Sequence, residues 1–300
     1  MSTWLSDAAV ERLRALEDRP DFSATRYELL EEIGRGGMGI VFRGRDTALN
    51  REVAIKVTAW SLAADAERLR REARTLAALE HPGIVPVHDV GEVADGRIFT
   101  VMMLVRGERL DTCAARLPLA DRLRLFDRIC DTISFAHARG VIHRDLKPAN
   151  IMIGAFGQVL ILDWGLALPG AGTGGDVVSG RGGTDGYMAP EQSGGNADAR
   201  SDVYALGAIL AGLTVDSGSR MLRPLKSVID RARASQPGAR YPDVASLAAD
   251  VRRFVDGAAV TAHPETLLER TRRVARVYRT PIALVLTYLV MRGLLLFWRN

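Results

Sequence analysis

The chain contains very little lysine and very little cysteine. Only three of its 40 basic residues are lysines: Lys56, Lys147 and Lys226. Since arginine is used wherever either cation would serve, each remaining lysine indicates a need for a compact ammonium group that a planar guanidinium cannot meet. Cys113 and Cys130 form no CxxC pair and no metal-binding spacing. This excludes a cysteine-based metal centre and is typical of a reduced, cytosolic protein.

The chain also lacks an export signal, an internal repeat and a net positive charge over residues 1–264. The first ten residues contain no basic segment followed by an apolar run, so we expect no cleavable signal peptide, and no internal repeat is present. Residues 265–300 hold seven arginines and two glutamates, a net charge of +5, whereas the whole chain carries +4, so residues 1–264 carry −1. The basic balance therefore belongs to the tail and does not indicate that the body binds nucleic acid.

What is present suits a two-lobed domain. Apolar residues make up 47% of the 300 residues, which is enough for a large core. Five segments have the composition and periodicity of strands: 27–33, 40–45, 51–57, 84–90 and 98–103. Helical periodicity predicts a helix over 64–79 and, after Gly107, a mainly helical half with helices over 119–139 and 201–213. The expected fold class is α+β, with a small five-stranded antiparallel lobe that carries one main helix and a mainly helical second lobe.

Two short motifs carry most of the chemical information. They are HRDLKPAN at residues 143–150 and DWG at residues 163–165. Phosphoryl transfer from a magnesium nucleotide needs the carboxylates, the lysine and the carboxamide that these motifs contain. Asp145 can accept the hydrogen bond of a substrate hydroxyl group, and Lys147 can neutralise the γ-phosphoryl group. Asn150 and Asp163 offer oxygen atoms of the kind that Mg²⁺ prefers.

A glycine-rich turn and a pair of charges belong to the same chemistry. The turn at 34–39, GRGGMG, joins two expected strands, which fits a flap over a triphosphate better than a dinucleotide-binding turn. Lys56 lies within an apolar strand, and Glu72 lies on the inward face of the helix expected over 64–79, so each charge needs a partner. We expect Lys56 to hold the α- and β-phosphates while Glu72 orients it.

A second glycine-rich segment follows the DWG motif. Residues 170–186 contain eight glycines, which predicts a mobile loop between DWG and the Ala-Pro-Glu motif at 189–191. Arg144 could pair with a phosphorylated residue of this loop. The candidate phosphorylation sites are Thr173, Ser179 and Thr184.

Over residues 27–256, these motifs resemble the bacterial members of the eukaryotic-like serine/threonine protein kinase family. Lys147 in the catalytic loop and GTDGYMAPE at 183–191 are similar to the serine/threonine branch and not to the tyrosine branch. The resemblance implies a bilobal protein kinase-like fold with lobes at 27–106 and 107–256. It also implies ATP with Mg²⁺ or Mn²⁺ as cofactors, serine or threonine side chains of proteins as substrates, and an activation loop whose autophosphorylation in trans would need a kinase dimer.

The resemblance also assigns positions to the nucleotide. Met102 would be the gatekeeper, and the backbone from Met103 to Val105 would be the hinge that binds adenine. The ATP-binding residues that it implies are Ile33, Gly34, Gly36, Gly37, Gly39, Val41, Ala54, Lys56, Met102, Met103, Val105 and Met152.

Several structural roles are implied in the same way. Thr184 would steady the catalytic loop, and Asp202 would anchor that loop from a helix. Glu191 would pair with Arg240.

Two features depart from the family pattern. Trp164 replaces the usual phenylalanine or leucine of the DWG motif, so we expect altered packing but retained metal binding. The segment 214–223 leads almost directly to the helix expected over 225–234, where the family has a longer stretch with a substrate-docking helix. We therefore expect complete phosphate-transfer machinery and a reduced platform for protein substrates.

The two ends of the chain lie outside this resemblance. Residues 1–26 are expected to be a helical arm, and residues 257–280 a basic segment. Residues 281–298 contain a single charge, Arg292, which is marginal for a membrane span of about 20 apolar residues. We expect a C-terminal hydrophobic helix that anchors a cytoplasmic kinase domain in the bacterial cell membrane. An interfacial helix that contacts anionic membrane lipid, or burial against a partner or the domain itself, stays open.

Two other functions stay open on the sequence. A pseudokinase or nucleotide-binding membrane scaffold would not transfer phosphate; the shortened segment after Leu213 favours it mildly, and the presence of every group that phosphoryl transfer needs argues against it. A phosphotransferase for small molecules is disfavoured by the complete GTDGYMAPE segment.

Overall fold

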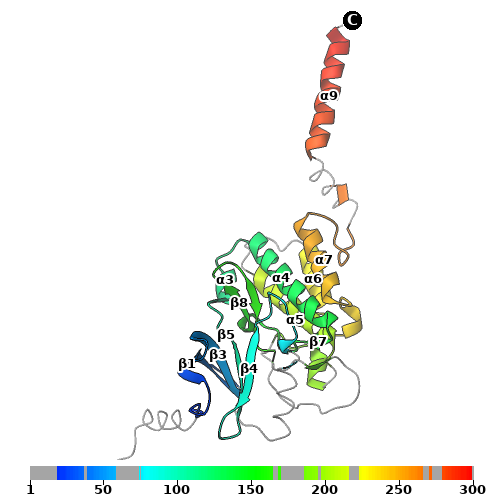
Figure 1. The fold of residues 1–300 in the computed structure, drawn as a ribbon. Coiled ribbons are helices and arrows are strands. Elements are labelled where there is room, and N and C mark those ends of the chain that lie inside the picture. Colours follow the sequence, from blue (N-terminus) through cyan, green and yellow to red (C-terminus); the bar gives the residue numbers. More distant parts are fainter. Residues whose placement is uncertain are drawn as a thin grey trace, which may run out of the picture.

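The structure of the chain is a computed structural model with a β-sheet, a mainly helical part and a separate C-terminal helix (Figure 1). It describes residues 19–36, 39–58, 74, 76–164, 168–169, 186–194, 197–215, 223–265, 270–271 and 279–298. The sheet and the helical part lie next to each other, and the C-terminal helix stands apart from both.

The sheet has five antiparallel strands, as expected for the small lobe, whereas the helix expected over 64–79 lies mostly outside the described residues. Its strands are β1 (Tyr27–Gly36), β2 (Gly39–Asp46), β3 (Arg51–Thr58), β4 (Val87–Glu92) and β5 (Ile98–Met103), in the spatial order β1-β2-β3-β5-β4. Val53, Ile55 and Val57 of β3 alternate along the strand, so all three face one apolar cluster together with Val101 of β5. None of these four side chains is more than 2% exposed. The period-two pattern therefore predicted both the strands and their buried face.

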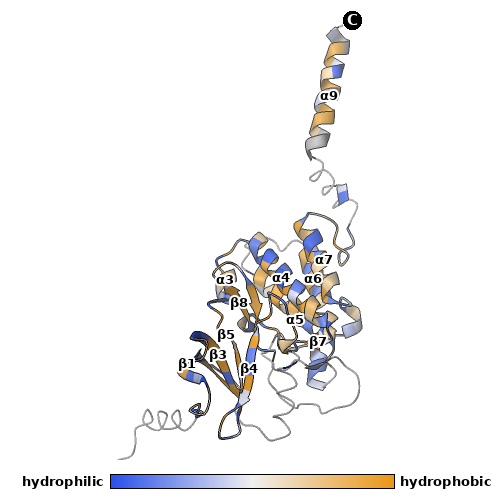
Figure 2. Ribbon diagram, in the orientation of Figure 1, coloured by the Kyte–Doolittle hydropathy of each residue, from blue (hydrophilic) through white to orange (hydrophobic). Residues whose placement is uncertain are grey.

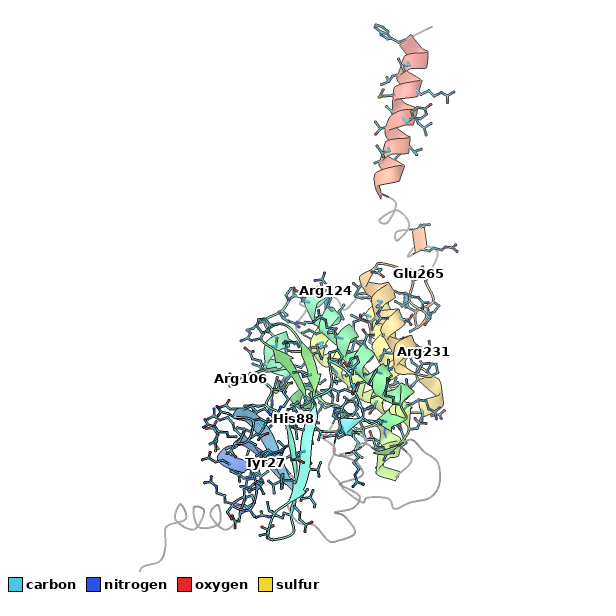
Figure 3. The ribbon with its side chains drawn as sticks, viewed as in Figure 1. Tyr27, His88, Arg106, Arg124, Arg231 and Glu265 are labelled. Atoms are coloured by element: carbon cyan, nitrogen blue, oxygen red, sulfur yellow. The ribbon has the colours of Figure 1, made fainter. Side chains whose placement is uncertain are left out.

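Backbone contacts and ion pairs connect the sheet to the helical part. Ile84 pairs with Ile161 in an isolated bridge, and the Ile161 N–H donates to the Gly83 carbonyl at 2.8 Å. Because Ile84 forms this bridge, β4 begins later along the chain than residue 84, where the sequence predicted its start. Arg106 lies between the two parts (Figure 3), and its Nη2 donates to Glu52 Oε2 of the sheet at 2.6 Å.

Residues 19–26 are bends and turns that pack on the sheet. Phe22 is 6% exposed, and its ring centroid lies 4.8 Å from that of Phe99. The Tyr27 hydroxyl donates to Asp89 Oδ2 at 2.7 Å, and burial together with this hydrogen bond raises the pKa of Tyr27 to about 12. The helix expected in the N-terminal arm lies outside the described residues; residues 19–26, which precede β1, cover the apolar end of the sheet.

The second part is mainly helical, as expected. Its helices are α3 (Leu110–Ala114), α4 (Leu119–Ala138), α5 (Ala199–Thr214), α6 (Arg223–Ala232) and α7 (Val244–Val255). Phe126, Ile129 and Ile133 of α4 follow at spacings of three and four and are fully buried, because this face packs against α5 and α7. Asp198 and Asp243 cap the N-termini of α5 and α7 with their side-chain oxygens.

A buried carboxylate closes the helical part at its C-terminal end. Asp250 of α7 accepts hydrogen bonds from the backbone N–H groups of Thr261 (2.8 Å) and Ala262 (3.0 Å) and from the Tyr241 hydroxyl (2.9 Å). Val260, beside them, is 4% exposed. The packed body therefore continues beyond residue 256, where we expected the domain to end; the division into domains is otherwise still a prediction.

The C-terminal helix, α9 (Arg279–Trp298), carries exposed apolar residues wherever its side chains are described (Figure 2). Leu284 and Leu295, for example, are 67% and 65% exposed. None of the helices that the structure describes combines the length and the apolar character that a bilayer crossing requires. The prediction of a transmembrane helix over 281–298 is therefore not supported; Arg292 interrupts the apolar stretch.

Replacement of Asp250 by asparagine should destabilise the body. A carboxylate that accepts several buried hydrogen bonds is exchanged for a group with one donor and one acceptor, so we expect the free energy of unfolding to fall by about 2 kcal/mol. Urea unfolding measures the change. Asp256→Asn, at an exposed position, is the control, and equal stability of the two variants would contradict the role of Asp250.

The same carboxylate should give the stability a dependence on acid pH. Burial raises the pKa of Asp250, but hydrogen bonds from Thr261 and Tyr241 outweigh this and hold the pKa below its ordinary value. A lowered pKa means that the contribution is present above about pH 4 and is lost as the pH falls through the folded-state value. Urea unfolding at several pH values should show a smaller acid dependence for Asp250→Asn than for the unmodified chain.

Candidate active site

The two chemical motifs meet because the strands around them pair. The elements concerned are β7 (Val141–Ile142), the 3-10 helix η1 (Pro148–Asn150), β8 (Ile151–Gly154) and β9 (Val159–Ile161). β8 and β9 are antiparallel, with Ile151 opposite Ile161. The backbone N–H of Leu162 donates to the Asn150 carbonyl at 2.8 Å. The DWG motif therefore begins beside the end of the HRDLKPAN loop.

Asp145 is held by two other polar residues of its own loop. Lys147 Nζ lies 2.9 Å from Asp145 Oδ2. Asn150 Nδ2 donates to the Asp145 backbone carbonyl at 2.8 Å and to Oδ2 at 3.1 Å. These bonds use the amide nitrogen of Asn150 and leave its side-chain oxygen as an acceptor. The loop thus places a carboxylate, an ammonium group and a carboxamide oxygen within one hydrogen-bonded group.

Lys56 forms an ion pair with Asp163 of the DWG motif. Burial raises the pKa of the Asp163 carboxyl, but the positive charges of Lys56 and Lys147 outweigh this and hold the pKa below its ordinary value. Asp163 is therefore ionised at neutral pH. The sequence led us to expect a Lys56–Glu72 pair, and the DWG carboxylate as a direct partner of the lysine was not foreseen.

The oxygen donors of the site fit a hard divalent cation. Asn150 and Asp163 present a carboxamide oxygen and an ionised carboxylate, which are ligands that Mg²⁺ accepts in combination with phosphate and water oxygens. Among the residues that the structure describes, no group of three or more His, Cys, Asp or Glu side chains could hold a metal ion by itself.

The register of the sheet places the expected nucleotide-binding residues opposite one another on neighbouring strands. Gly34 pairs with Val41, Val41 with Lys56, and Ala54 with Met102. Their assignment to ATP stays a prediction, but four strands contribute to one continuous surface, as the assignment requires.

Other expected nucleotide positions are placed as follows. Gly39 has φ 140°, and a Cβ there would lie 2.0 Å from the Val57 carbonyl oxygen, so only glycine fits. The Met103 N–H of the expected hinge donates to the Pro86 carbonyl at 3.1 Å, so this hinge donor is engaged within the protein. Ile33 is 47% exposed.

Some expected site residues lie outside the described part of the chain: Gly37, Glu72, Thr173, Ser179 and Thr184. The Lys56–Glu72 pair and the phosphorylation sites therefore stay predictions.

Trp164 and His143 pack together behind the site. Trp164 is 4% exposed, and its ring centroid lies 4.7 Å from that of His143. Trp164 Nε1 donates to the Ile161 carbonyl at 3.1 Å. Burial lowers the pKa of His143, so the ring is neutral; its Nδ1 accepts from the Asp145 N–H at 3.3 Å, and its Nε2 therefore donates to the Leu162 carbonyl at 3.0 Å.

Asp202 of α5 anchors the catalytic loop through its backbone. Its Oδ2 accepts from the His143 N–H and its Oδ1 from the Arg144 N–H, both at 2.9 Å. Its Oδ2 also lies 2.7 Å from His137 Nε2. Burial raises the pKa of Asp202, but the hydrogen bonds from His137 and from the His143 backbone N–H outweigh this and hold the pKa below its ordinary value. The anchoring position matches the expectation, and the contact of Asp202 with His137 was not foreseen.

Glu191 and Arg240 form the expected ion pair. Arg240 Nη1 and Nη2 donate to the two carboxylate oxygens of Glu191, each at 2.7 Å, and the Arg240 side chain has no exposed surface. The Ser201 hydroxyl donates to Glu191 Oε1 at 2.9 Å. This bidentate pair fixes the Ala-Pro-Glu motif to the helical part.

The paired motifs beside a five-stranded sheet define a kinase-like fold. The family model described as protein kinase domain matches residues 27–232. The chain therefore belongs to the protein kinase family, and this membership implies the use of ATP and a divalent metal ion.

The curated relatives include bacterial serine/threonine-protein kinases, which confirms the resemblance drawn from the motifs. PknB of Mycolicibacterium smegmatis is 37% identical over 291 residues, which cover 84% of this chain and 46% of that protein. PknB of Mycobacterium tuberculosis is 42% identical over 203 residues, 64% of this chain and 32% of that protein. PknD of Chlamydia caviae is 32% identical over 319 residues, 86% of this chain and 34% of that protein. The chain spans less than half the length of these relatives.

Removal of the Glu191 side chain should destabilise the protein, because it leaves the buried charge of Arg240 without its carboxylate. In Glu191→Ala the Arg240 guanidinium loses its carboxylate in a buried position, so we expect the free energy of unfolding to fall by about 3 kcal/mol. The double variant Glu191→Ala/Arg240→Met removes the orphaned charge and should be more stable than Glu191→Ala. Urea unfolding of the three proteins measures both steps, and a double variant that is less stable than Glu191→Ala would contradict the explanation.

Proposed function

We propose that this chain transfers the γ-phosphoryl group of ATP to serine and threonine hydroxyl groups of proteins, with Mg²⁺, or Mn²⁺ in its place, as the metal ion. The observation that carries the proposal is the hydrogen-bonded group of Asp145, Lys147 and Asn150 beside the Lys56–Asp163 ion pair. These five groups supply an acceptor for the substrate proton, positive charge for the phosphates and oxygen ligands for the metal ion.

Asp145 orients the acceptor hydroxyl in this proposal. Its carboxylate, held by Lys147 and Asn150, accepts the hydrogen bond of the substrate hydroxyl and takes its proton as the new oxygen–phosphorus bond forms and the bond from the γ-phosphorus to the leaving oxygen of ADP breaks. Lys147 Nζ lies 2.9 Å from that carboxylate. Its positive charge is therefore close to the acceptor oxygen and can stabilise the negative charge of the transferred group.

Asn150 of the HRDLKPAN motif, Asp163 of the DWG motif and Lys56 of β3 hold the nucleotide and its metal ion. Asn150 and Asp163 would ligate Mg²⁺, which neutralises phosphate charge when it is bound. Lys56 would bind the α- and β-phosphates. Because Asp163 is ionised and already paired with Lys56, the two opposite charges that nucleotide binding requires are brought to one place by the fold.

The contact with protein substrates is reduced on one side. α5 ends at Thr214 and α6 begins at Arg223, which leaves little chain for the substrate-docking helix that the family pattern contains. We propose that the segment around the Ala-Pro-Glu motif, at 186–191, carries a larger share of substrate contact.

The proposal extends to regulation and to the tail. Autophosphorylation at Thr173, Ser179 or Thr184 within a kinase dimer, and a cytoplasmic location of the kinase domain, are part of it. The exposed apolar side chains of α9, preceded by Arg270 and other arginines, support contact of the tail with anionic lipid at a membrane surface.

Phosphate transfer should depend on Asp145. With ATP and Mg²⁺, the unmodified chain should incorporate labelled phosphate into itself or into casein, and Asp145→Asn should reduce the rate by a factor of about 100 or more. Asp111→Asn changes an exposed carboxylate on α3 and should leave the rate unchanged. No incorporation by the unmodified chain, or equal incorporation by Asp145→Asn, would support the pseudokinase alternative.

Lipid contact should depend on the tail. The full chain should co-sediment with phosphatidylglycerol vesicles and much less with phosphatidylcholine vesicles, and the binding should weaken as salt is added. A chain that ends at Glu265 keeps the packed residues up to His263 and should stay in the supernatant. Equal sedimentation of the two chains would rule out the tail as the lipid-binding element.

A further inference from the structure

Gln192 joins the Ala-Pro-Glu motif to the catalytic loop with both ends of its side chain. It lies in the 3-10 helix η2 (Pro190–Gly194). Its Nε2 donates to the Arg144 carbonyl at 2.8 Å, and its Oε1 accepts from the Ala189 N–H at 2.9 Å. The Gln192 backbone N–H also donates to the Ala189 carbonyl at 3.0 Å. The carboxamide is thus fixed in orientation by a donor and an acceptor on two different segments.

The carbonyl that Gln192 contacts belongs to the peptide group between Arg144 and Asp145. Arg144 has φ 67°, a left-handed conformation that costs energy in a residue with a side chain and needs support from its surroundings. The N–H of the same peptide group, on Asp145, donates to His143 Nδ1 at 3.3 Å. The two ends of this peptide group are therefore held by different side chains. A rotation of the group would displace the Asp145 side chain that follows it.

The three side chains that hold this stretch of backbone come from different places. Asp202 holds the Arg144 N–H from α5, and His143 holds the Asp145 N–H from within the loop. Gln192 alone among these three approaches from the Ala-Pro-Glu motif. Ala189, at its other end, is 1% exposed, so a movement of the 186–191 segment is passed on through a buried contact.

We propose that Gln192 is a positioning residue that transmits the placement of the 186–191 segment to Asp145. The inference rests on the proposed function, in which that segment contacts the protein substrate and Asp145 orients the acceptor hydroxyl. Gln192 touches neither reactant in this proposal. It sets the peptide group before Asp145, so that a substrate seated against the 186–191 segment and the carboxylate that receives its proton are aligned by one side chain.

The residues on either side of Gln192 have other partners. Glu191 is bound to Arg240 and Ser201 in the helical part. The Ser193 hydroxyl donates to the Pro190 carbonyl at 2.7 Å within η2 itself. Ser193→Ala therefore removes a hydrogen bond from the same 3-10 helix without changing a contact to the catalytic loop, and it is the matched control.

Two substitutions separate the ends of the Gln192 side chain. Gln192→Met has a similar length and lacks both hydrogen bonds. Gln192→Glu keeps an acceptor for the Ala189 N–H but has no donor for the Arg144 carbonyl at neutral pH. If the contact to Arg144 positions Asp145, both variants should lower kcat for casein phosphorylation about fivefold or more, the effect of one lost hydrogen bond. The KM for ATP should stay at the value of the unmodified chain, and the Tm should fall by no more than the few degrees that the lost hydrogen bonds cost. Ser193→Ala, which also loses a hydrogen bond, should keep the kcat of the unmodified chain.

Amide hydrogen exchange of residues 143–147 is measured on the same proteins. It should be faster in Gln192→Met and Gln192→Glu than in Ser193→Ala, whether or not any phosphate is transferred. Unchanged kcat with unchanged exchange overturns the proposal. A parallel loss of Tm and ATP affinity also overturns it, because that pattern indicates general structural support.

Failure of the proposed function and failure of the role of Gln192 give different experimental results. An unmodified chain that transfers no phosphate contradicts the proposed function, and the exchange rates alone then decide whether Gln192 holds the loop. An active chain whose Gln192 variants exchange and turn over like Ser193→Ala contradicts the role of Gln192 and leaves the proposed function intact.

Discussion

The buried carboxylate of Asp202 is the interaction on which the rest of the site depends. The catalytic loop must turn sharply, and Arg144 adopts a left-handed backbone conformation to do so. A backbone N–H at such a turn has no strand or helix partner, and Asp202 supplies acceptors for two of them. Asp202 belongs to α5, which is buried over most of its length. The backbone of the loop is therefore fixed to the helical core.

Three sets of side-chain interactions hold the catalytic loop and the Ala-Pro-Glu motif in place. Asp202 fixes the backbone from the core, and the Glu191–Arg240 pair fixes the Ala-Pro-Glu motif to the same core. Gln192 then joins these two fixed segments to each other. Asp145, Lys147, Asn150 and Asp163 thus lie in two short motifs, and the backbone of the first motif is held by groups that would touch neither ATP nor substrate.

Much of this architecture could be predicted from the sequence, and the omissions have a common cause. The alternation in β1, β2, β3 and β5 predicted the sheet and its core, and the motifs predicted that Asp145, Lys147, Asn150 and Asp163 belong together. His137, Gln192 and Asp250 were not recognised. Each acts through hydrogen bonds to backbone groups or to side chains distant in sequence, and such bonds leave no periodicity or spacing by which to find them. The pair of Lys56 and Asp163 was missed for a related reason, because charge alone does not say which of several carboxylates lies closest.

The closure of the helical part by Asp250 has a mechanical consequence for the tail. The chain leaves the body only after Val260 is buried and the N–H groups of Thr261 and Ala262 are bound. Force applied through α9 would load the contact of His263 Nδ1 with the Ser227 hydroxyl as well as these hydrogen bonds to Asp250, and several of them would have to break before the force spread further into the described helical part. These contacts therefore lie along the described chain between α9 and the helical core that carries the active site.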